Sequence, residues 1–175
     1  MNFIEIIDYP RAVVSRLDLA SGTLQELERR LALIYLGRPH SSSAVHEKVM
    51  LELKRLGPDC AQLDALRGAA EHARDAALTG DFDALGRAMR RNTDAQAELH
   101  ADLVQRDAWR VIEIAAAHGA AGWKVNGAGG DGGSITLLCG ADVAAKRAMI
   151  RAVEQESSAF VSIPVEISRS GLRVW

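Results

Sequence analysis

A glycine-rich stretch late in the chain is the first candidate for chemistry. Residues 124–140, KVNGAGGDGGSITLLCG, hold six glycines and run into an apolar segment. Glycine tolerates positive φ and lets a backbone approach groups that a Cβ would block. A hairpin turn needs one or two glycines, so this density favours close approach to a ligand or to another loop; a glycine-rich hairpin is the alternative. The candidate residues are Lys124, Asn126, Gly127, Ala128, Gly129, Gly130, Asp131, Gly132 and Gly133.

This glycine loop differs from the common phosphate-binding loops. A Walker A loop requires a Lys-Ser/Thr pair at its end, and no such pair follows Gly133. Residues 127–132 fit the GxGxxG spacing of dinucleotide-binding loops, but an apolar strand is predicted where that fold places a helix. The loop is therefore not expected to cradle a nucleotide phosphate independently.

A second candidate site is the segment GRPHSSSAVH, residues 37–46, which joins a predicted strand to a predicted helix. Arg38 and the three serines Ser41, Ser42 and Ser43 precede the first helical turn. Serine hydroxyls and free N–H groups at a helix N-terminus, beside a guanidinium, form an anion pocket. An N-cap serine with solvated neighbours is an equally supported alternative.

Two amides interrupt the apolar stripe of a predicted helix that begins after Asp81. Asn92 and Gln96 lie one turn apart on a stripe that otherwise carries leucine and methionine. Buried amides require hydrogen-bond partners, so this pair either caps a neighbouring backbone or faces a polar cleft. The alternative is a break between two helices near Asn92, which would make Asn92 a cap.

Composition excludes several classes of protein. The 175 residues suit one domain, or one domain and a small part of another, with a hydrophobic core. The net charge of -2 gives no reason to expect nucleic acid or an anionic membrane as partner. Cys60 and Cys139 are far apart in apolar settings, which indicates a reduced, cytoplasmic protein without disulfides. No apolar run approaches the ~18 residues of a membrane span. His100 has no second ligand at metal spacing, so no metal site is predicted.

The periodicity of apolar residues predicts an α+β fold. Strands that flank a loop, followed by a helix and a returning strand, indicate a ferredoxin-like split β-α-β unit with an inserted multi-helix middle. Strands are expected at residues 3–7, 12–14, 31–36, 123–126, 134–139, 159–167 and 172–175. A short helix or turn is expected at 23–29, and helices at 45–56, 60–79, from 82 onward, 107–118 and 142–153.

The order of these segments resembles the C-terminal half of the GHMP kinases, the superfamily of galactokinase, homoserine kinase, mevalonate kinase and phosphomevalonate kinase. The resemblance rests on GRPHSSS, on LTGDFDALGRAMRRN at residues 78–92 and on HGAAGWKVNGAGGDGGSITLL at residues 118–138. Its most specific part is a basic residue, Lys124, followed by the glycine loop and an apolar strand. Asp131 and Ser134 depart from the family's unbroken glycine run. Within the superfamily, the likeness is to D-glycero-D-manno-heptose 7-phosphate kinases and fucokinase-type enzymes.

The resemblance implies that residues 1–20 are strands from the end of an N-terminal kinase domain and that residues 21–175 form the C-terminal domain. The chain would be the substrate-side domain of an ATP-dependent sugar or sugar-phosphate kinase. The glycine loop, the segment with Arg38 and Ser41 to Ser43, and the helix with Asn92 would border the sugar site.

The family's ATP-binding segment, Pro-x-x-x-Gly-Leu-x-Ser-Ser-Ala, does not occur in this sequence. We therefore expect the chain to be inactive alone, as a fragment, a split-gene product or a stand-alone protein, and to work with an N-terminal kinase half. ATP and magnesium would serve the intact kinase, and neither is expected to bind tightly to this chain. The alternative is a non-catalytic anion-binding, partner-binding or dimerisation module of the same fold, with self-association into a homo-oligomer.

Overall fold

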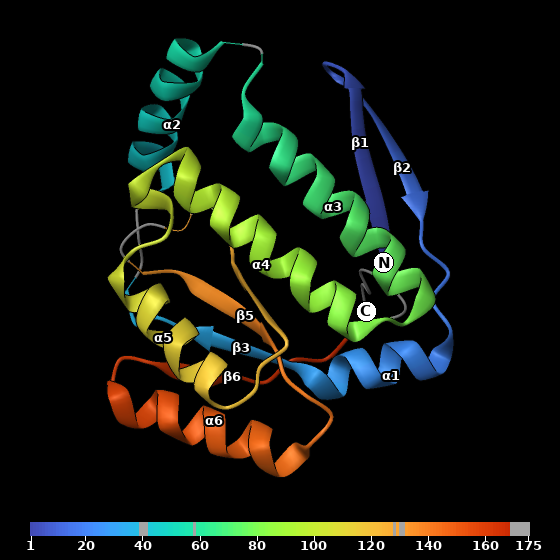
Figure 1. Ribbon diagram of the computed structural model, residues 1–175, viewed down its shortest axis with the longest axis vertical. Helices are drawn as coiled ribbons and strands as arrows, with labels where there is room; N and C mark the ends of the chain where they lie inside the picture. The colour runs from blue at the N-terminus through green and yellow to red at the C-terminus, as the bar shows by residue number, and fades with distance from the viewer. Residues whose placement is uncertain (39–41, 58, 128, 130–131, 169–175) are drawn as a thin grey trace, which may run out of the picture.

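The computed structural model describes residues 1–38, 42–57, 59–127, 129 and 132–168, with the backbone alone at residues 42–44. Its strands form two antiparallel sheets (Figure 1). The first sheet is a hairpin of β1 (Asn2–Asp8) and β2 (Arg11–Arg16). The second contains β3 (Leu31–Tyr35), β4 (Gly122–Val125), β5 (Ser134–Leu138) and β6 (Val161–Ile163) in the order β4-β5-β3-β6. This order is that of a split β-α-β unit, which confirms the predicted α+β fold.

Six α-helices are described: α1 (Ser21–Arg30), α2 (Ser42–Leu56), α3 (Ala61–Thr79), α4 (Phe82–Leu99), α5 (Arg106–Ala117) and α6 (Val143–Glu156). A short 3₁₀ helix, η1 (Ala101–Leu103), follows α4. Three helix boundaries follow the chemistry expected of the sequence. Gly80 ends α3 with φ of 71°, the Asp81 carboxylate accepts a hydrogen bond from the Ala84 N–H at 2.8 Å, and Gly119 turns the chain after α5 with φ of 73°.

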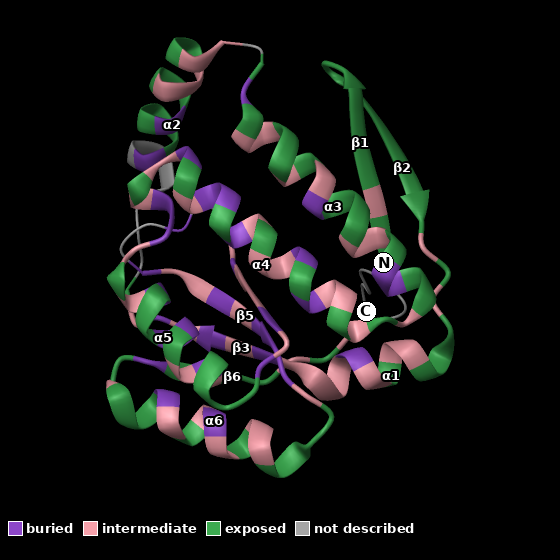
Figure 2. Ribbon diagram, in the orientation of Figure 1, coloured by how far each residue is buried: buried purple, intermediate pink, exposed green. Residues whose placement is uncertain are grey.

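The hydrophobic core lies on one face of the four-stranded sheet. Along β3, buried Ala32 and Ile34 alternate with half-buried residues, and Leu137 of β5 is fully buried beside them. These side chains share one cluster with Val111 of α5 and Met149 of α6 (Figure 2). The period of two along the strands therefore separates a helix-covered face from a more open face.

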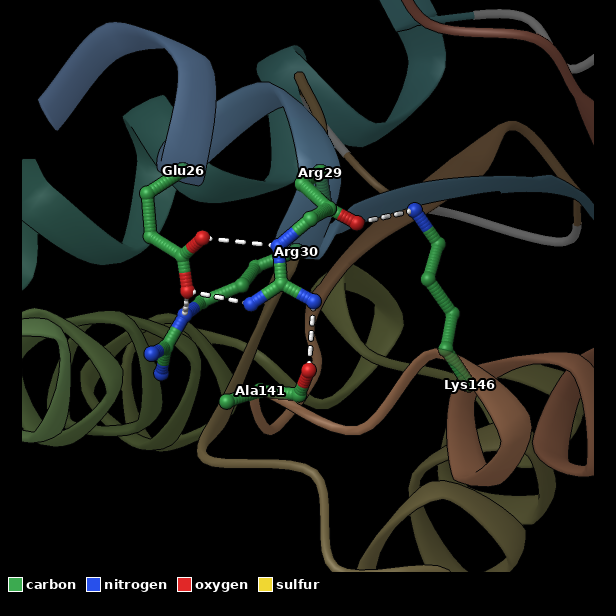
Figure 3. Close-up of polar contacts among 5 residues, drawn as sticks. All are labelled: Glu26, Arg29, Arg30, Ala141 and Lys146. Carbon is green, nitrogen blue, oxygen red and sulfur yellow. Dashed lines mark hydrogen bonds and ion pairs between the residues drawn. The ribbon is translucent and has the colours of Figure 1, made fainter. Parts of the chain in front are cut away.

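Ion pairs within α1, together with hydrogen bonds from α1 to Ala141 and from α6 to α1, hold these segments together (Figure 3). The Glu26 carboxylate accepts hydrogen bonds from the guanidinium groups of Arg29 and Arg30, which lower the pKa of Glu26 to about 2. Arg29 also donates to the carbonyl of Ala141, and the Lys146 ammonium donates to the Arg29 carbonyl at 2.7 Å.

The β1–β2 hairpin stands beside α3 and carries most of its apolar side chains in contact with solvent (Figures 1 and 2). Ile6 is 68% exposed and Tyr9 is 87% exposed. One contact with α3 is the Arg74 guanidinium, which lies 4.7 Å from the centre of the Phe3 ring. A two-stranded sheet has little stability of its own in water, and the apolar residues of this hairpin leave an exposed hydrophobic surface.

The structure differs from the sequence prediction in three places. Strand β6 is shorter than the expected strand at 159–167, because Pro164 lacks the N–H that would continue the ladder. Helix α4 continues to Leu99, so the alternative of a break at Asn92 is wrong. The segment at 23–29, expected as a short helix or turn, is part of the full helix α1. The strand expected at 172–175 lies outside the described residues.

Candidate functional site

Helix α4 covers the open edge of strand β4. Thr93 is fully buried, and its hydroxyl donates to the Trp123 carbonyl at 3.2 Å and accepts from the Val125 N–H at 3.4 Å. An edge strand exposes unpaired N–H and C=O groups, and this threonine satisfies two of them. Thr93 was not among the predicted site residues, although it lies two helical turns after Gly86 on the face that approaches β4.

The gap between α4 and β4 is narrow because both elements place glycine there. A Cβ on Gly86 would lie 2.3 Å from the Ala121 carbonyl oxygen, and a Cβ on Gly122 would lie 2.5 Å from the Cα of Gly86. Both distances are well below a normal contact. The two glycines therefore allow the backbone approach that brings the polar residues of α4 to the glycine loop.

Residues from two segments that the sequence analysis treated separately meet at the base of the glycine loop. The Lys124 ammonium donates to Gln96 Oε1 at 2.9 Å, and Gln96 Nε2 donates to the Gly127 carbonyl at 3.2 Å. Lys124 also donates to the carbonyl of Val125. Gln96 therefore caps a neighbouring backbone, which is one of the two roles predicted for it.

Asn126 closes the neck of the loop on the adjacent strand. Its Nδ2 donates to Ser134 Oγ at 3.0 Å, its Oδ1 accepts from Thr136 Oγ1 at 3.1 Å, and its N–H donates to the Ser134 carbonyl at 3.0 Å. Both ends of the loop are thus joined by hydrogen bonds across β4 and β5. The loop does connect two paired strands, as in a hairpin, but its neck is fixed by side chains as well as by the ladder.

The glycines of the loop allow it to contact other parts of the chain. Gly129 has φ of 62°, and a Cβ there would lie 1.7 Å from the Leu103 carbonyl oxygen of η1. Gly132 has φ of 127°, and its Cβ would lie 2.2 Å from the Arg38 carbonyl oxygen. Gly133 donates its N–H to that same carbonyl at 3.1 Å. Close approach was expected to a ligand or to another loop, and these approaches are to the chain's own backbone.

Several predicted site residues are not placed. Ala128, Gly130, Asp131 and Ser41 lie outside the described residues, as do the side chains of Ser42 and Ser43. Arg38 is exposed, and its carbonyl accepts the loop contact just described. The anion pocket of arginine and serines therefore stays a prediction, while the backbone of Arg38 lies against the glycine loop.

Asn92 has a different environment from Gln96. Its Oδ1 is buried and has no hydrogen-bond partner among the described residues, and the same holds for Trp123 Nε1. The Arg90 guanidinium lies 5.5 Å from the centre of the Trp123 ring. A buried acceptor without a partner costs free energy, so Asn92 is a position where a hydroxyl or water would be stabilising.

Burial lowers the pKa of Lys124 to about 8. The described part of the chain contributes no carboxylate to an ion pair with this ammonium. Among the described residues, the ammonium is balanced by the amide oxygen of Gln96 and the carbonyl of Val125. The protonation of such a group responds to small changes in its surroundings.

Two further findings concern metals and membranes. Within the described ranges, no group of three His, Cys, Asp or Glu side chains is placed to hold a metal ion. None of the helices described is both long enough and apolar enough to cross a membrane.

Residues 73–155 match the family model described as GHMP kinases C terminal. Three solved structures share the fold: L. major mevalonate kinase in complex with R-mevalonate, a D-glycero-D-manno-heptose 1-phosphate kinase from Bacteroides thetaiotaomicron, and Streptococcus pneumoniae phosphomevalonate kinase in complex with phosphomevalonate and AMPPNP. Their TM-scores are 0.72, 0.54 and 0.64, and their sequence identities to this chain are 20%, 18% and 11%. No curated protein matches the chain.

These alignments cover 92%, 93% and 88% of this chain but 47%, 40% and 43% of the solved chains. The chain thus spans less than half the length of the structures that it matches. The likeness covers most of the chain, and it agrees with the resemblance drawn from the glycine loop. The chain therefore shares its fold with part of these kinases, and residues 73–155 of it match the model of the GHMP kinase C-terminal domain.

Proposed function

We propose that this chain is the substrate-side half of an ATP-dependent sugar or sugar-phosphate kinase. It acts together with an N-terminal half, on the same or a separate polypeptide, that supplies the nucleotide loop and the catalytic carboxylate. The γ-phosphorus of ATP forms a bond to a sugar hydroxyl oxygen, and the bond to the β–γ bridging oxygen breaks. The base that accepts the hydroxyl proton is not assigned to a residue of this chain.

The observation that carries this proposal is the position of the glycine loop. Gln96 and Asn126 hold the described ends of the loop at β4 and β5, and Gly129 and Gly132 lie against the backbone of other segments, so these parts of the loop are positioned without a ligand. Phosphoryl transfer depends mainly on positioning and on stabilising spread negative charge. A fixed backbone loop beside a half-buried ammonium suits this task.

The described residues offer more groups to the phosphates of a nucleotide than to a metal ion. Within the described residues, no group of three His, Cys, Asp or Glu side chains is placed to hold a metal ion. We propose that the N-terminal half supplies the magnesium ligands. When bound, ATP supplies the phosphoryl group. This chain contributes the backbone of the glycine loop to the wall that faces the phosphates, and Lys124 supports that loop from its base.

The proposed substrate class is a sugar phosphate of the heptose 7-phosphate type. Arg38 and Ser41 to Ser43 would bind its phosphate, because a guanidinium and serine hydroxyls at a helix N-terminus suit a dianion. The buried Asn92 Oδ1 would accept from a sugar hydroxyl, which would satisfy an acceptor that has no partner among the described residues. The fucokinase-type substrates, which carry no phosphate, are the alternative. We further propose that the protein is cytoplasmic, as its sequence predicts.

A docking surface for the N-terminal half is the β1–β2 hairpin. Its exposed apolar residues include Ile4, Ile6, Ile7, Val14 and Tyr9. Burying these side chains against a partner would stabilise the complex by about 25 cal/mol for each Å² of apolar surface that is removed from water. The hairpin would then extend a sheet of the partner half rather than stand alone.

The decisive experiment measures ADP release with ATP, magnesium and a panel of sugars and sugar phosphates. The chain alone should give no turnover above background, and the chain mixed with an N-terminal GHMP half should turn over a sugar phosphate. Arg38→Ala should raise KM for the phosphorylated sugar about 10-fold or more, because one charge-assisted contact is lost. Turnover by the chain alone would overturn the two-half proposal.

The exposed hairpin also favours a second candidate, a non-catalytic module that self-associates. Sedimentation velocity, measured for the unmodified chain and for Ile6→Lys, distinguishes the kinase half from the self-associating module. Leu51→Lys is the matched control, because Leu51 of α2 is also 67% exposed but lies on another element. A stable dimer that Ile6→Lys dissociates, with no binding to any N-terminal half, would favour the module.

A further inference from the structure

The strongest unassigned arrangement is the hydrogen-bond chain from Lys124 through Gln96 to Gly127. Lys124 lies on β4 and Gln96 lies on α4, and the two side chains meet at 2.9 Å. The amide of Gln96, which is 9% exposed, then reaches the Gly127 carbonyl at 3.2 Å. These contacts link an element of the scaffold to the first residue of the glycine run.

Elementary hydrogen-bond chemistry fixes the direction of this chain. A lysine ammonium has donors and no acceptor, so the oxygen of the Gln96 amide must face it. The Gly127 carbonyl is an acceptor, so the NH₂ of the same amide must face the loop. Both ends therefore select one orientation of the Gln96 amide, and reversal would place like groups against each other at both ends.

Lys124 is poorly placed to contact a phosphate itself. Its side chain is half-buried, and its ammonium donates to Gln96 and to the carbonyl of Val125. Releasing it toward a ligand would leave the Gln96 oxygen without its donor in a buried position, which is costly. The geometry thus assigns this lysine to the support of the loop.

We propose that Lys124 and Gln96 form a positioning pair, in which the ammonium orients the amide and the amide holds the Gly127 carbonyl, thereby setting the backbone of the glycine loop. Neither side chain contacts the transferred phosphoryl group. This inference deepens the proposed function and rests on it for the identity of the ligand that the loop faces. The pair itself is a property of the chain alone and is tested without a ligand.

The first test uses the unmodified chain and nuclear magnetic resonance. A scalar coupling between Gln96 Nε2 and the Gly127 carbonyl carbon would report the hydrogen bond directly. The exchange rate of the Gly129 amide reports the order of the loop, because this N–H donates to the Asn126 carbonyl next to the bond in question. We expect a measurable coupling and slow exchange.

The second test compares substitutions that separate the two ends of the pair. Gln96→Glu keeps an acceptor for Lys124 but removes the donor for Gly127, so the loop should loosen while the lysine stays engaged. Gln96→Leu removes both contacts, and Lys124→Met removes the group that orients the amide. Each should speed Gly129 exchange about 5-fold to 10-fold, the size expected for one net hydrogen bond. The double variant Lys124→Met/Gln96→Leu should add little to either change, because both act on one contact.

Lys146→Met is the matched control. Lys146 is also partly buried and donates to the backbone carbonyls of Arg29 and Leu31, but it lies on α6 away from the loop. It should leave Gly129 exchange unchanged. Urea unfolding of each variant identifies any that fails to fold, and the coupling measured in the unmodified chain still decides the matter in that case.

Wild-type exchange in Gln96→Glu, or the absence of the coupling in the unmodified chain, would overturn the positioning pair. Failure of the proposed kinase function has a different signature: no turnover with any N-terminal half, while the coupling and the exchange changes persist. If the kinase reconstitutes, Gln96→Glu should lower kcat more than it raises KM, because a displaced loop affects the transition state more than substrate binding.

Discussion

Gly86 of α4 and Gly122 of β4 lie in direct backbone contact, so that a Cβ on Gly122 would approach the Cα of Gly86 to 2.5 Å. The same contact brings Thr93 to the edge of β4 and Gln96 to Lys124. The separation of this helix and strand therefore sets both the sealing of the sheet edge and the support of the glycine loop. Changes at the two glycines should affect both.

Gly86→Ala tests this contact. The added methyl group would lie 2.3 Å from the Ala121 carbonyl oxygen, so α4 must move away from β4. We expect a loss of about 1–3 kcal/mol in the free energy of unfolding, measured in urea, as for other overpacked sites. Gly68→Ala of α3 is the control, because its Cβ would meet nothing within 4 Å, and it should gain about 0.5–1 kcal/mol. A gain in both variants would contradict the close contact.

The loop glycines offer a second matched pair. Gly127 and Gly129 have nearly equal φ, 64° and 62°, so replacement by alanine costs about 1–2 kcal/mol at either position through the left-handed backbone. Gly129→Ala must in addition displace the Leu103 carbonyl, whereas a Cβ on Gly127 meets nothing within 4 Å. Gly129→Ala should therefore destabilise the chain more than Gly127→Ala in thermal unfolding. Equal losses would show that the loop does not press against η1.

Local chemistry made much of this architecture predictable. The Asp81 cap, the glycines after α3 and α5, and the apolar alternation of β3 and β5 act within a few residues of one another, so the sequence pattern alone indicates them. The glycine loop is predictable for the same reason, because it contains more glycines than a turn requires.

Contacts between residues that are distant in the sequence were not predictable, because such contacts depend on the tertiary structure. Gln96 and Lys124 are 28 residues apart, and their meeting depends on the angle at which α4 crosses β4. Thr93 was missed because a threonine inside a helix is usually unremarkable, and its role appears only with the sheet edge beside it. The apolar residues after Pro164 predict a strand longer than β6, but the missing N–H of Pro164 ends the ladder there.

The Glu26 cluster predicts a dependence of stability on acid pH. The pKa of this carboxyl is lowered to about 2 in the folded chain by the hydrogen bonds from Arg29 and then Arg30, against 4.5 ordinarily. Its contribution is present above pH 4.5 and is lost as the pH falls toward about 2, because the unfolded chain then binds the additional proton. The difference in unfolding free energy between the unmodified chain and Glu26→Gln should shrink across that range. Glu47→Gln, at an exposed position of α2, is the control for removing one negative charge from the surface.

Asn92 provides a prediction that separates stability from binding. Because its buried Oδ1 has no partner among the described residues, Asn92→Leu should leave the melting temperature of the chain unchanged or raise it by a few degrees. In a reconstituted kinase the same variant should weaken binding of the sugar, since the acceptor for a hydroxyl is lost. A large destabilisation would instead show that the amide is satisfied by an ordered water.

Lys124 predicts a pH dependence of the same sign as Glu26, but in an alkaline window and from a different cause. Its pKa is lowered to about 8 by burial, against 10.5 ordinarily, so the unfolded chain binds more protons between these two values. The unfolding free energy should therefore rise with pH from about 8 to 10.5, as the cost of burying the charged form disappears. Other titrating groups contribute to the raw curve, so the quantity to measure is the difference between the unmodified chain and Lys124→Met in urea at each pH. That difference should increase across the window and stay constant below it; a constant difference at all pH values would mean that the ammonium is fully solvated and cannot orient Gln96.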